Sequence, residues 1–477
     1  MTTPALPDAP RWAALLGGWR AHPGPLHARL TAALRGAITA GQLAPGERLP
    51  AERALAALLG VSRSTVVGAL DDLAESGWVT RRVGSGTHVS PTAPRRSPVM
   101  TLRTPVAVGG PPDDTLDFTI AVPLLTNAQR VRMRGAAQDA FVESVYHPHG
   151  LPELRAVLAE VYTREGLATR PEQVVVTSGA QQAISLIAAT VLRRGDHALL
   201  ETPTYFGAID VFRAAGAELH GVPVGERGVN PDDFARVVRA HRPRLAFLTP
   251  TYHNPTGTVL SPRDRGRVAG VIADEALPTI EDDTLYDLGF TDTPPPARLS
   301  THAPGAPIVN VGSLSKLYWA GLRVGWMRVP DAYAGPLGQA KTLADFGGSL
   351  PAQHIALHLL SDLDTLRRDR REQVRAARDL LAGLLRAHLP EWSFRTPDGG
   401  QYLWIELPTP GASRFTHLAA PYGVRLFPGA SMGVEPLPDR YLRLPFTLDP
   451  ERLPDAVLRL RAAWAEFRAR PGSEGLA

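Results

Sequence analysis

The chain of 477 residues contains no cysteine, which excludes disulfides, thiolate metal sites and cysteine nucleophiles. No apolar run approaches the ~20 residues of a membrane-spanning helix. The N-terminal stretch MTTPALPDAPRW lacks the basic and apolar regions of a secretory signal. We therefore expect a cytoplasmic protein without a membrane partner. Two or three domains are expected, because one core rarely serves more than about 300 residues.

Lysine is almost absent as well. Of the 51 lysines and arginines, only Lys316 and Lys341 are lysine. A guanidinium stays protonated, whereas an ammonium can lose its proton when desolvated and form a Schiff base with an aldehyde. A lysine retained in such a composition is a candidate for amine chemistry, and the alternative is that both lysines remain by chance. Lys341 fits the chance alternative. Whether Lys316 serves amine chemistry depends on the residues around it.

Positive charge is concentrated near the N-terminus. Residues 1–98 contain eleven arginines and six acidic residues, a net charge of +5 within a total of +4. The rest of the chain therefore carries a net charge of −1. A small basic domain ahead of a nearly neutral body favours a polyanionic partner for the first part.

Three helices and a hairpin are predicted between residues 25 and 90. Apolar residues recur every four positions over 26–38, and a short helix follows in LPAERALAALLG. A third helix begins at the N-cap Ser62 and stops at Gly77. WVTRRVGSGTHVS then reads as two strands around a Gly-Ser-Gly turn. This order is that of a winged helix-turn-helix.

A helix-turn-helix presents the first residues of its recognition helix to base edges. An arginine fork suits guanine, short hydroxyl side chains suit phosphates or bases, and a slim wing tip suits a minor groove. The predicted DNA-binding residues are Arg53, Ser62, Arg63, Ser64 and Thr65, with Gly84, Ser85 and Gly86 at the wing tip.

A linker and a second, larger domain are predicted after the hairpin. Residues 91–114 are dense in proline and glycine, whereas 1–24 form an N-terminal extension and 471–477 a tail. Strand-like runs then alternate with helical ones: QVVVTSG, HALLETP, RLAFLTP, LPTIEDD and PIVNVGSLSK. This alternation predicts an α/β domain with a large, mostly parallel sheet, whose functional residues follow the carboxyl ends of the strands.

Several of these strand ends carry the groups that pyridoxal 5′-phosphate needs beside a reactive lysine. The phosphate needs amide donors at a helix N-terminus and a cation, the pyridine nitrogen a carboxylate, the ring a flat partner and the phenolic oxygen a donor. The phosphate candidates are Ser178, Gly179 and Ala180 with Arg323 and Ser313 or Ser315. The carboxylate candidates are Asp282 and Asp283, the flat partner is Tyr205 and the donor is Asn254.

In this order the motifs resemble fold-type I pyridoxal-phosphate enzymes of the class I/II aminotransferase family, over about residues 115–470. The resemblance implies a smaller C-terminal α+β subdomain over about 345–470 and makes Lys316 the Schiff-base lysine. It also implies that Arg443, in YLRLPF, binds a substrate α-carboxylate as a fork. Tyr146, in YHPHGLPELR, would approach the cofactor phosphate of the partner subunit in a homodimer.

Two positions depart from the family pattern. The family's pyridine aspartate is usually followed three residues later by a tyrosine. Asp282 places Leu285 there, whereas Asp283 places Tyr286 there. We favour Asp282 because it follows the apolar strand directly, and Asp283 with Tyr286 stays open as the alternative. The segment around Tyr146 is also one residue short.

The first domain resembles GntR-type transcription regulators over residues 25–89, and Val67 stands where many of them carry a further arginine, as in the MocR-type branch. The whole chain resembles MocR-type regulators. That resemblance implies a pyridoxal-phosphate-dependent regulator that binds a double-stranded DNA operator. It would sense the cofactor itself, or a small amino or carboxylate effector, through an aldimine at Lys316. The alternative is an active aminotransferase with an accessory DNA-binding domain.

Overall fold

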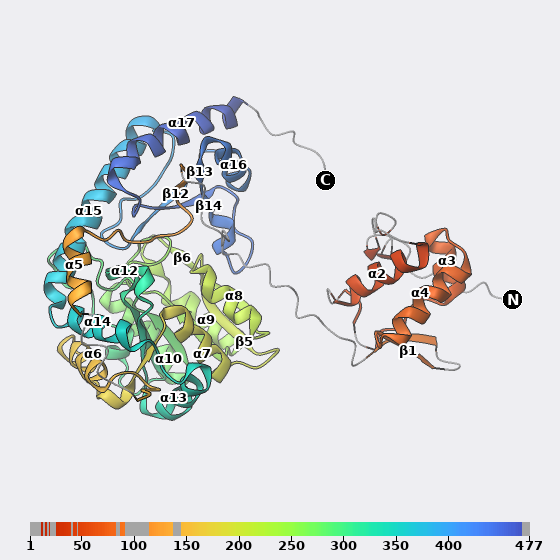
Figure 1. Ribbon diagram of the computed structural model, residues 1–477, viewed down its shortest axis with the longest axis horizontal. Coiled ribbons are helices and arrows are strands. Elements are labelled where there is room, and N and C mark those ends of the chain that lie inside the picture. Colours follow the sequence, from red (N-terminus) through yellow and green to blue (C-terminus); the bar gives the residue numbers. More distant parts are fainter. Residues whose placement is uncertain are drawn as a thin grey trace. The chain divides into compact units, whose positions relative to one another are not determined.

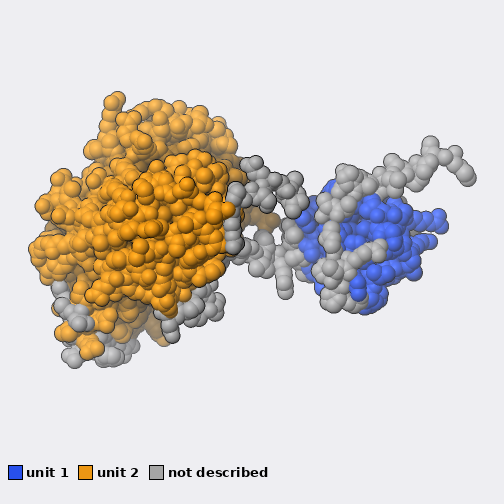
Figure 2. All heavy atoms as spheres, turned by 90° about the horizontal axis from the view of Figure 1, so that it is seen from above, with its two compact units in different colours: residues 1–101 blue, residues 102–477 orange. Residues whose placement is uncertain are grey.

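The computed structural model divides into two compact units, residues 1–101 (unit 1) and 102–477 (unit 2), which Figure 2 colours separately. In unit 1 it describes residues 11, 12, 15, 16, 19, 25–39, 42–44, 46–82 and 86–90. In unit 2 it describes residues 114–136 and 145–469. Two predicted wing residues, Gly84 and Ser85, lie outside the described residues, as do most of the predicted linker and the tail.

Unit 1 contains the predicted winged helix-turn-helix. Glycine and serine mark the helix boundaries: Gly60 ends the second helix with φ 62°, and the Ser62 Oγ accepts a hydrogen bond from the Thr65 backbone N–H at 3.2 Å. The two strands pair antiparallel. The elements are α2 (Leu26–Thr39), α3 (Glu52–Leu59), α4 (Arg63–Glu75), β1 (Val79–Arg82) and β2 (Gly86–Val89).

Part of the predicted N-terminal extension belongs to the core of unit 1. Trp12, Leu16 and Trp19 are buried in the same cluster as Leu34 of α2 and Leu70 of α4. Their spacing of four and three residues is that of one helix face, a signal that the prediction overlooked. Among the described helices, none alone is long and apolar enough to cross a membrane. Only the pair of α3 and α4, bent by 117°, reaches that length and composition.

An eight-stranded sheet in the order β4-β11-β10-β9-β8-β5-β6-β7 forms the centre of unit 2. The neighbours from β10 to β6 pair in parallel, while β11 and β7 pair antiparallel. All five strands predicted from sequence are present in this mostly parallel sheet. The strands are β4 (Val174–Thr177), β5 (His197–Thr202), β6 (Glu218–Gly225), β7 (Gly228–Val229), β8 (Leu245–Leu248), β9 (Thr279–Asp282), β10 (Ile308–Ser313) and β11 (Gly325–Arg328).

Helices cover both faces of this sheet (Figure 1). One face packs against α7, α8 and α13, and the other against α9, α10 and α11. Burial on both faces explains why the central strands are continuous apolar runs rather than alternating ones. The helices are α6 (Pro152–Arg164), α7 (Ala180–Val191), α8 (Phe206–Ala214), α9 (Pro231–His241), α10 (Pro262–Asp274), α11 (Leu299–His302), α12 (Leu314–Leu317) and α13 (Asp331–Asp345), with the 3₁₀ turns η3 (Pro171–Gln173) and η4 (Ala320–Leu322).

A second, smaller sheet of three strands, in the order β12-β15-β14, has its own core with α15, α16 and α17. Near the start of unit 2, β3 pairs in parallel with β13, so the chain that leads to α5 lies against this smaller layer (Figure 1). The remaining elements are β3 (Leu116–Asp117), α5 (Asn127–Ala136), α14 (Leu350–Leu360), α15 (Leu363–His388), β12 (Tyr402–Glu406), α16 (Ala412–Ala419), η5 (Ala420–Tyr422), β13 (Val424–Arg425), β14 (Phe427–Pro428), η6 (Gly429–Met432), β15 (Tyr441–Pro445), η7 (Pro450–Arg452) and α17 (Leu453–Ala469).

Candidate cofactor and DNA-binding sites

The predicted site residues of unit 2 meet at one edge of the large sheet. Ser178 follows β4, Tyr205 follows β5, Asn254 follows β8, Asp282 ends β9 and Lys316 follows β10. Strand β4 runs in the same direction as β10, because both pair antiparallel with β11. The carboxyl ends of these strands therefore face the same way, as expected for a site in an α/β sheet.

Lys316 lies on the short helix α12, directly after β10. The Ser313 Oγ caps this helix by accepting a hydrogen bond from the Ser315 backbone N–H at 3.1 Å. The Lys316 Nζ donates to the carbonyl of Ala121 at 2.8 Å, and the Gln401 side chain donates to the Lys316 carbonyl at 3.1 Å. The lysine is thus held at both its main chain and its amine.

Asp282 is the carboxylate on the Lys316 side of the sheet. It is buried, and its Oδ1 accepts a hydrogen bond from the Thr284 backbone N–H at 2.9 Å. Burial raises the pKa of Asp282, the hydrogen bonds from Thr284 lower it, the charge of Glu201 raises it and the charge of Lys316 lowers it. The charges of Glu201 and Lys316 thus act on the pKa of Asp282 in opposite directions.

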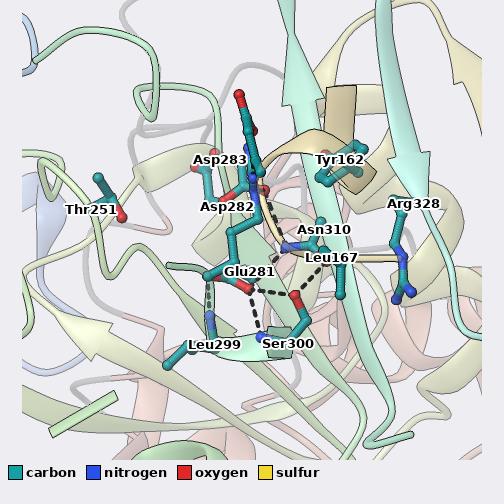
Figure 3. Close-up of polar contacts among 12 residues, drawn as sticks. Tyr162, Leu167, Thr251, Glu281, Asp282, Asp283, Leu299, Ser300, Asn310 and Arg328 are labelled. Atoms are coloured by element: carbon teal, nitrogen blue, oxygen red, sulfur yellow. Dashed lines mark hydrogen bonds and ion pairs between the residues drawn. The ribbon is translucent and has the colours of Figure 1, made fainter. Parts of the chain in front are cut away.

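Asp283 points the other way, because successive residues alternate between the faces of a strand. Its carboxylate accepts hydrogen bonds from the Arg298 Nε at 2.7 Å and the Asn310 Nδ2 at 3.1 Å. Figure 3 shows the buried network around it, in which Asn310 also donates to Glu281 at 2.8 Å and the Ser300 hydroxyl donates to Asn310 at 3.1 Å.

Tyr286 lies beside this second network and not beside Asp282. The Arg298 guanidinium stacks 3.8 Å from the Tyr286 ring centroid. Burial raises the pKa of Tyr286 to about 12. Leu285, at the position that Asp282 would pair with a tyrosine, is buried in an apolar cluster with Leu314. The geometry therefore separates the pair Asp283 and Tyr286 from Lys316.

The turn Ser178–Ala180 forms a narrow cradle with Arg323 at the N-terminus of α7. The Arg323 Nη2 donates to the Ser178 carbonyl at 2.6 Å. Gly179 has φ 115°, and a Cβ there would lie 2.7 Å from the same Nη2 atom. A Cβ on Gly325 would lie 2.7 Å from the Gly179 Cα. Because Gly179 and Gly325 have no side chains, Arg323 can lie directly beside the N-terminus of α7. A cation beside a helix N-terminus suits a phosphate.

Tyr205 and Asn254 are two further predicted site residues at the carboxyl ends of the strands. The Tyr205 hydroxyl donates to the Gln181 Oε1 at 2.9 Å. Burial raises the pKa of Tyr205, and the charges acting on its phenol include those of Asp282, Arg443 and Arg323. Asn254 is buried, and its Oδ1 has no hydrogen-bond partner within the described part of the chain. A buried orphan of this kind fits a site that receives a ligand with polar atoms.

Arg443 lies in an aromatic cage beside the same site. Its guanidinium carbon is 4.7 Å from the ring centroids of Tyr402 and Phe427 and 5.5 Å from that of Phe206. The Nη2 donates to the carbonyl of Thr119, while the Nε is buried without a partner among the described residues. Burial lowers the pKa of Arg443, and the nearby tyrosines raise it. The aromatic rings therefore shield the Arg443 guanidinium from water, while its Nε–H has no partner among the described residues.

The remaining predicted residue of unit 2, Tyr146, does not join the Lys316 site within one chain. It is 83% exposed, and its ring centroid lies 6.3 Å from that of Phe346. Lys341, in contrast, is not a surface residue. It is fully buried and forms an ion pair with Asp345, which also accepts a hydrogen bond from Gln182 at 2.8 Å.

At the start of α4 the predicted DNA-binding residues Ser62, Arg63 and Ser64 are exposed, and Thr65 is half-buried. The Arg63 side chain is 58% exposed, and its Nε and Nη2 donate to the Glu52 carboxylate at 3.1 and 2.9 Å. Ser62 lies within hydrogen-bond distance of Ser64 and Thr65 through the hydroxyl groups, at 2.9 and 2.7 Å. The other two described residues of this set, Arg53 and Gly86, are exposed as well.

Sequence reasoning missed several residues that shape these sites. Their signals were weak, because each is an ordinary polar residue within a helix, strand or loop and its partner is distant in the chain. Arg370 of α15, for example, is buried and donates to the carbonyls of Leu317 and Tyr318 at 2.7 and 2.8 Å. It thereby holds the end of the helix that carries Lys316. The others are Glu52, Gln181, Glu201, Arg298, Asn310 and Gln401.

Two family sequence patterns match this chain. The pattern "Aminotransferase class I and II" covers residues 109–460, and "Bacterial regulatory proteins, gntR family" covers residues 26–89. The HTH-type transcriptional regulator TauR of Rhodobacter capsulatus is 30% identical, over 92% of this chain and 96% of the relative. The probable rhizopine catabolism regulatory protein MocR of Rhizobium meliloti is 28% identical, over 92% and 94%.

A solved structure resembles unit 2. The crystal structure of LysN, an alpha-aminoadipate aminotransferase of Thermus thermophilus, matches with 29% identity and a TM-score of 0.70. The match covers 75% of this chain and 94% of LysN. The fold of unit 2 is therefore that of fold-type I aminotransferases. With a gntR-type domain ahead of it, the chain belongs to the class I and II aminotransferase family and, by its domain arrangement, to the MocR-type subfamily of GntR regulators.

Proposed function

We propose that this chain is a cytoplasmic DNA-binding transcription regulator whose aminotransferase-like unit binds pyridoxal 5′-phosphate at Lys316. It responds either to that cofactor or to a small amino compound with a carboxylate. The observation that carries the proposal is a recognition helix with an exposed arginine at its start, on the same chain as a partly buried lysine that follows a strand of an aminotransferase-like sheet. An enzyme that acts only on metabolites has no need of the first feature.

The residues at the sheet edge fit the cofactor. The cradle of Ser178–Ala180 and Arg323, with the hydroxyls of Ser313 and Ser315, suits its phosphate, and Tyr205 is a flat partner for its ring. The Asn254 side chain is buried, and its Nδ2 amino group would donate to the phenolic oxygen. We assign Asp282 as the carboxylate that contacts the pyridine nitrogen, because the Asp283 carboxylate already accepts a hydrogen bond from Arg298. When bound, pyridoxal phosphate supplies an aldehyde carbon that bonds to the Lys316 amine and a ring that withdraws electrons.

Arg443 sets the chemical class of the effector. A buried guanidinium with an unpartnered Nε favours a carboxylate, because two parallel N–H groups match its two oxygens. The aromatic rings around it exclude water and strengthen that interaction. We therefore expect an amino acid or a related amino carboxylate, in keeping with the substrates of aminotransferases such as LysN.

A homodimer completes this proposal. Val145, Tyr146, Leu343 and Phe346 are exposed by 60, 83, 84 and 60% and are all apolar or aromatic. Tyr146 and Phe346 lie side by side. Large exposed apolar residues that gather in one place mark a protein interface. The second copy would cover them and bring Tyr146 close to the neighbouring cofactor phosphate.

The second candidate function is an active aminotransferase, which the resemblance of unit 2 to LysN favours. An absorbance titration of the cofactor-loaded protein with a panel of amino acids, including ω-amino acids, separates the two functions. The regulator predicts a stable spectral change without release of a keto acid, together with altered binding to DNA. Bleaching to the pyridoxamine form, reversed by a keto acid, would instead establish turnover.

A further inference from the structure

A short segment between β3 and α5 covers the Lys316 site. We refer to residues 118–124 as the strap. Within it, Phe118 and Ala121 are buried, whereas Ile120, Val122 and Leu124 are exposed by 50, 36 and 41%. The strap therefore turns its larger aliphatic side chains outward, while its carbonyl groups reach the site.

Three cationic side chains hold the carbonyl groups of the strap, and two of them belong to the candidate ligand site. Their donors come from three different elements, α12, α15 and β15, so the strap joins the lysine helix to the smaller layer. The pairs are Arg443 Nη2 with the Thr119 carbonyl at 2.5 Å, Lys316 Nζ with the Ala121 carbonyl at 2.8 Å and Arg370 Nη1 with the Leu124 carbonyl at 3.3 Å.

The strap carbonyls contact the same nitrogen atoms that a ligand would use. A carboxylate that binds Arg443 through Nε and Nη2 would share Nη2 with the Thr119 carbonyl, while the adjacent Nε has no partner among the described residues. An amine that has bonded to an aldehyde carbon no longer has its ammonium hydrogens to donate, so Lys316 would release Ala121. A ligand that engages either group therefore competes with one strap carbonyl.

The two ends of the strap are fixed independently of these contacts. Asp117 accepts a hydrogen bond from the Thr119 backbone N–H at 2.8 Å and forms an ion pair with Arg425 at 3.0 Å. Arg370, at the other end, also holds the end of α12. The middle of the strap, residues 120–122 with the Thr119 carbonyl, is held by the ligand-binding cations.

We propose that the strap is an internal competitor of the ligand, and that ligand binding releases its middle from Lys316 and Arg443. This inference rests on the proposed function, because it takes Lys316 and Arg443 as the groups that receive cofactor and effector. The strap follows β3, which begins at Leu116, two residues after the end of the predicted linker. The strap is thus continuous, through β3 and its pairing with β13, with the segment that leads to unit 1.

The absence of cysteine allows a direct test in the full-length chain. Ile120→Cys places a single spin label on the exposed side of the strap, away from both ligand-binding cations. Leu458→Cys, on α17 and 49% exposed, is the matched control. We expect pyridoxal phosphate to increase label mobility at position 120 and to leave position 458 unchanged. Adding Lys316→Ala should abolish the response.

Covalent attachment of the cofactor is measured in the same samples by absorbance and by mass after borohydride reduction. If it attaches while the label at 120 stays unchanged or becomes less mobile, the strap proposal is overturned and the cofactor assignment stands. If it does not attach, the proposed function fails, and Arg443→Met then tests the strap alone. That variant should mobilise the label without any ligand, and an unchanged spectrum would refute the competition.

Hydrogen exchange of the unlabelled protein is the second measurement, should a labelled variant fold poorly. The amides of residues 120–122 should exchange at least several-fold faster with pyridoxal phosphate bound. Those of Leu116, Phe118 and Thr119, which donate to Gly423, Arg425 and Asp117, should change little. Slower exchange over 120–122 would mean that the strap closes on the ligand and would refute the proposal.

Discussion

The two units hold their functional arginines in different ways. In unit 1 the Arg63 side chain is 58% exposed, and its partner is the carboxylate of Glu52. In unit 2 Arg443 is 2% exposed, and its partner is the neutral carbonyl of Thr119. An exposed ion pair contributes only about 0.2–1 kcal/mol and is screened by salt, so phosphates exchange with it easily.

A buried arginine that contacts a carbonyl and aromatic rings, as Arg443 does, has no anionic partner to compensate its charge, so it gains more from an anionic ligand. The difference suits the two proposed tasks. A surface site must slide along a polyanion and release it readily, whereas a sensor site must respond to one compound among many. The substitutions that follow test this contrast, in order of decreasing effect.

Lys316→Ala should abolish covalent attachment of the cofactor, because no other described amine lies at the carboxyl ends of the strands. Unit 1 should stay folded. Absorbance and mass after borohydride reduction measure the attachment, and circular dichroism measures the fold. Lys341→Arg is the matched control, since it keeps a charge beside Asp345 and should still bind the cofactor. A borohydride-stable link that persists in Lys316→Ala would contradict the assignment.

Arg443→Gln should weaken the response to amino acids about a hundredfold, which corresponds to about 3 kcal/mol for a lost charged hydrogen bond in a dry site. Attachment of the cofactor should be unaffected. The measurement is the concentration of the most effective amino acid at half-maximal spectral change. Arg440→Gln, on the same segment but more exposed and paired with Glu406, should respond like the wild type. Equal loss in both variants would show that Arg443 acts only through the fold.

Glu165→Gln should cost about 2–3 kcal/mol of unfolding free energy at pH 7, because Glu165 pairs with both Arg298 and Arg367 in a mostly buried site. Burial by itself would raise the pKa of Glu165, but the charges of the two arginines outweigh it and lower the pKa. The ionised form is thus favoured in the folded state. Its stabilisation is complete above the unfolded value of about 4.3 and is lost as the pH falls through the folded value.

Urea unfolding of the wild type and Glu165→Gln between pH 7 and pH 3 measures this difference, which should shrink below about pH 4. The matched change at the surface pair, Glu52→Gln, should cost less than about 1 kcal/mol. Similar losses in the two variants would remove the contrast between buried and exposed ion pairs.

Arg63→Ala should weaken binding to selected DNA about tenfold, since a two-point contact to one base is worth about 1–3 kcal/mol. The probes are duplexes that the wild-type protein selects from a random library, with unselected duplexes for comparison. Binding to the unselected duplexes should fall much less. A uniform loss on both would make Arg63 a phosphate contact. Glu52→Gln removes a surface acid and should instead strengthen unselected binding a few-fold at low salt.

Local structure was accessible from the sequence wherever one short stretch carries its own signal. The helix of Arg63 has its cap at Ser62, three residues before the amide that it binds, and the five predicted strands are continuous apolar runs. The linked motifs in their order also pointed to the edge of the sheet where they meet. The roles of the individual site residues stay predictions.

Other features escaped prediction because the burial of a side chain depends on what packs around it. Sequence reasoning left Lys341 to chance, and the structure shows it fully buried against Asp345. Trp12 and Trp19 lay in a predicted extension, yet they are buried in the core of unit 1. The spacing of these tryptophans with Leu16 indicates a helix face, but the surface that covers this face comes from α2 and α4.

Sequence alone established the two-part architecture, the family and the candidate residues, because caps, periodicities and motifs act over a few positions. The different environments of the two adjacent aspartates appear only in the folded chain, because Arg298 reaches Asp283 across fifteen positions. Folding also brought the strap to the site, over 195 positions to Lys316 and 324 to Arg443. Contacts at such separations arise from the packing of whole layers, so no single stretch of sequence encodes them.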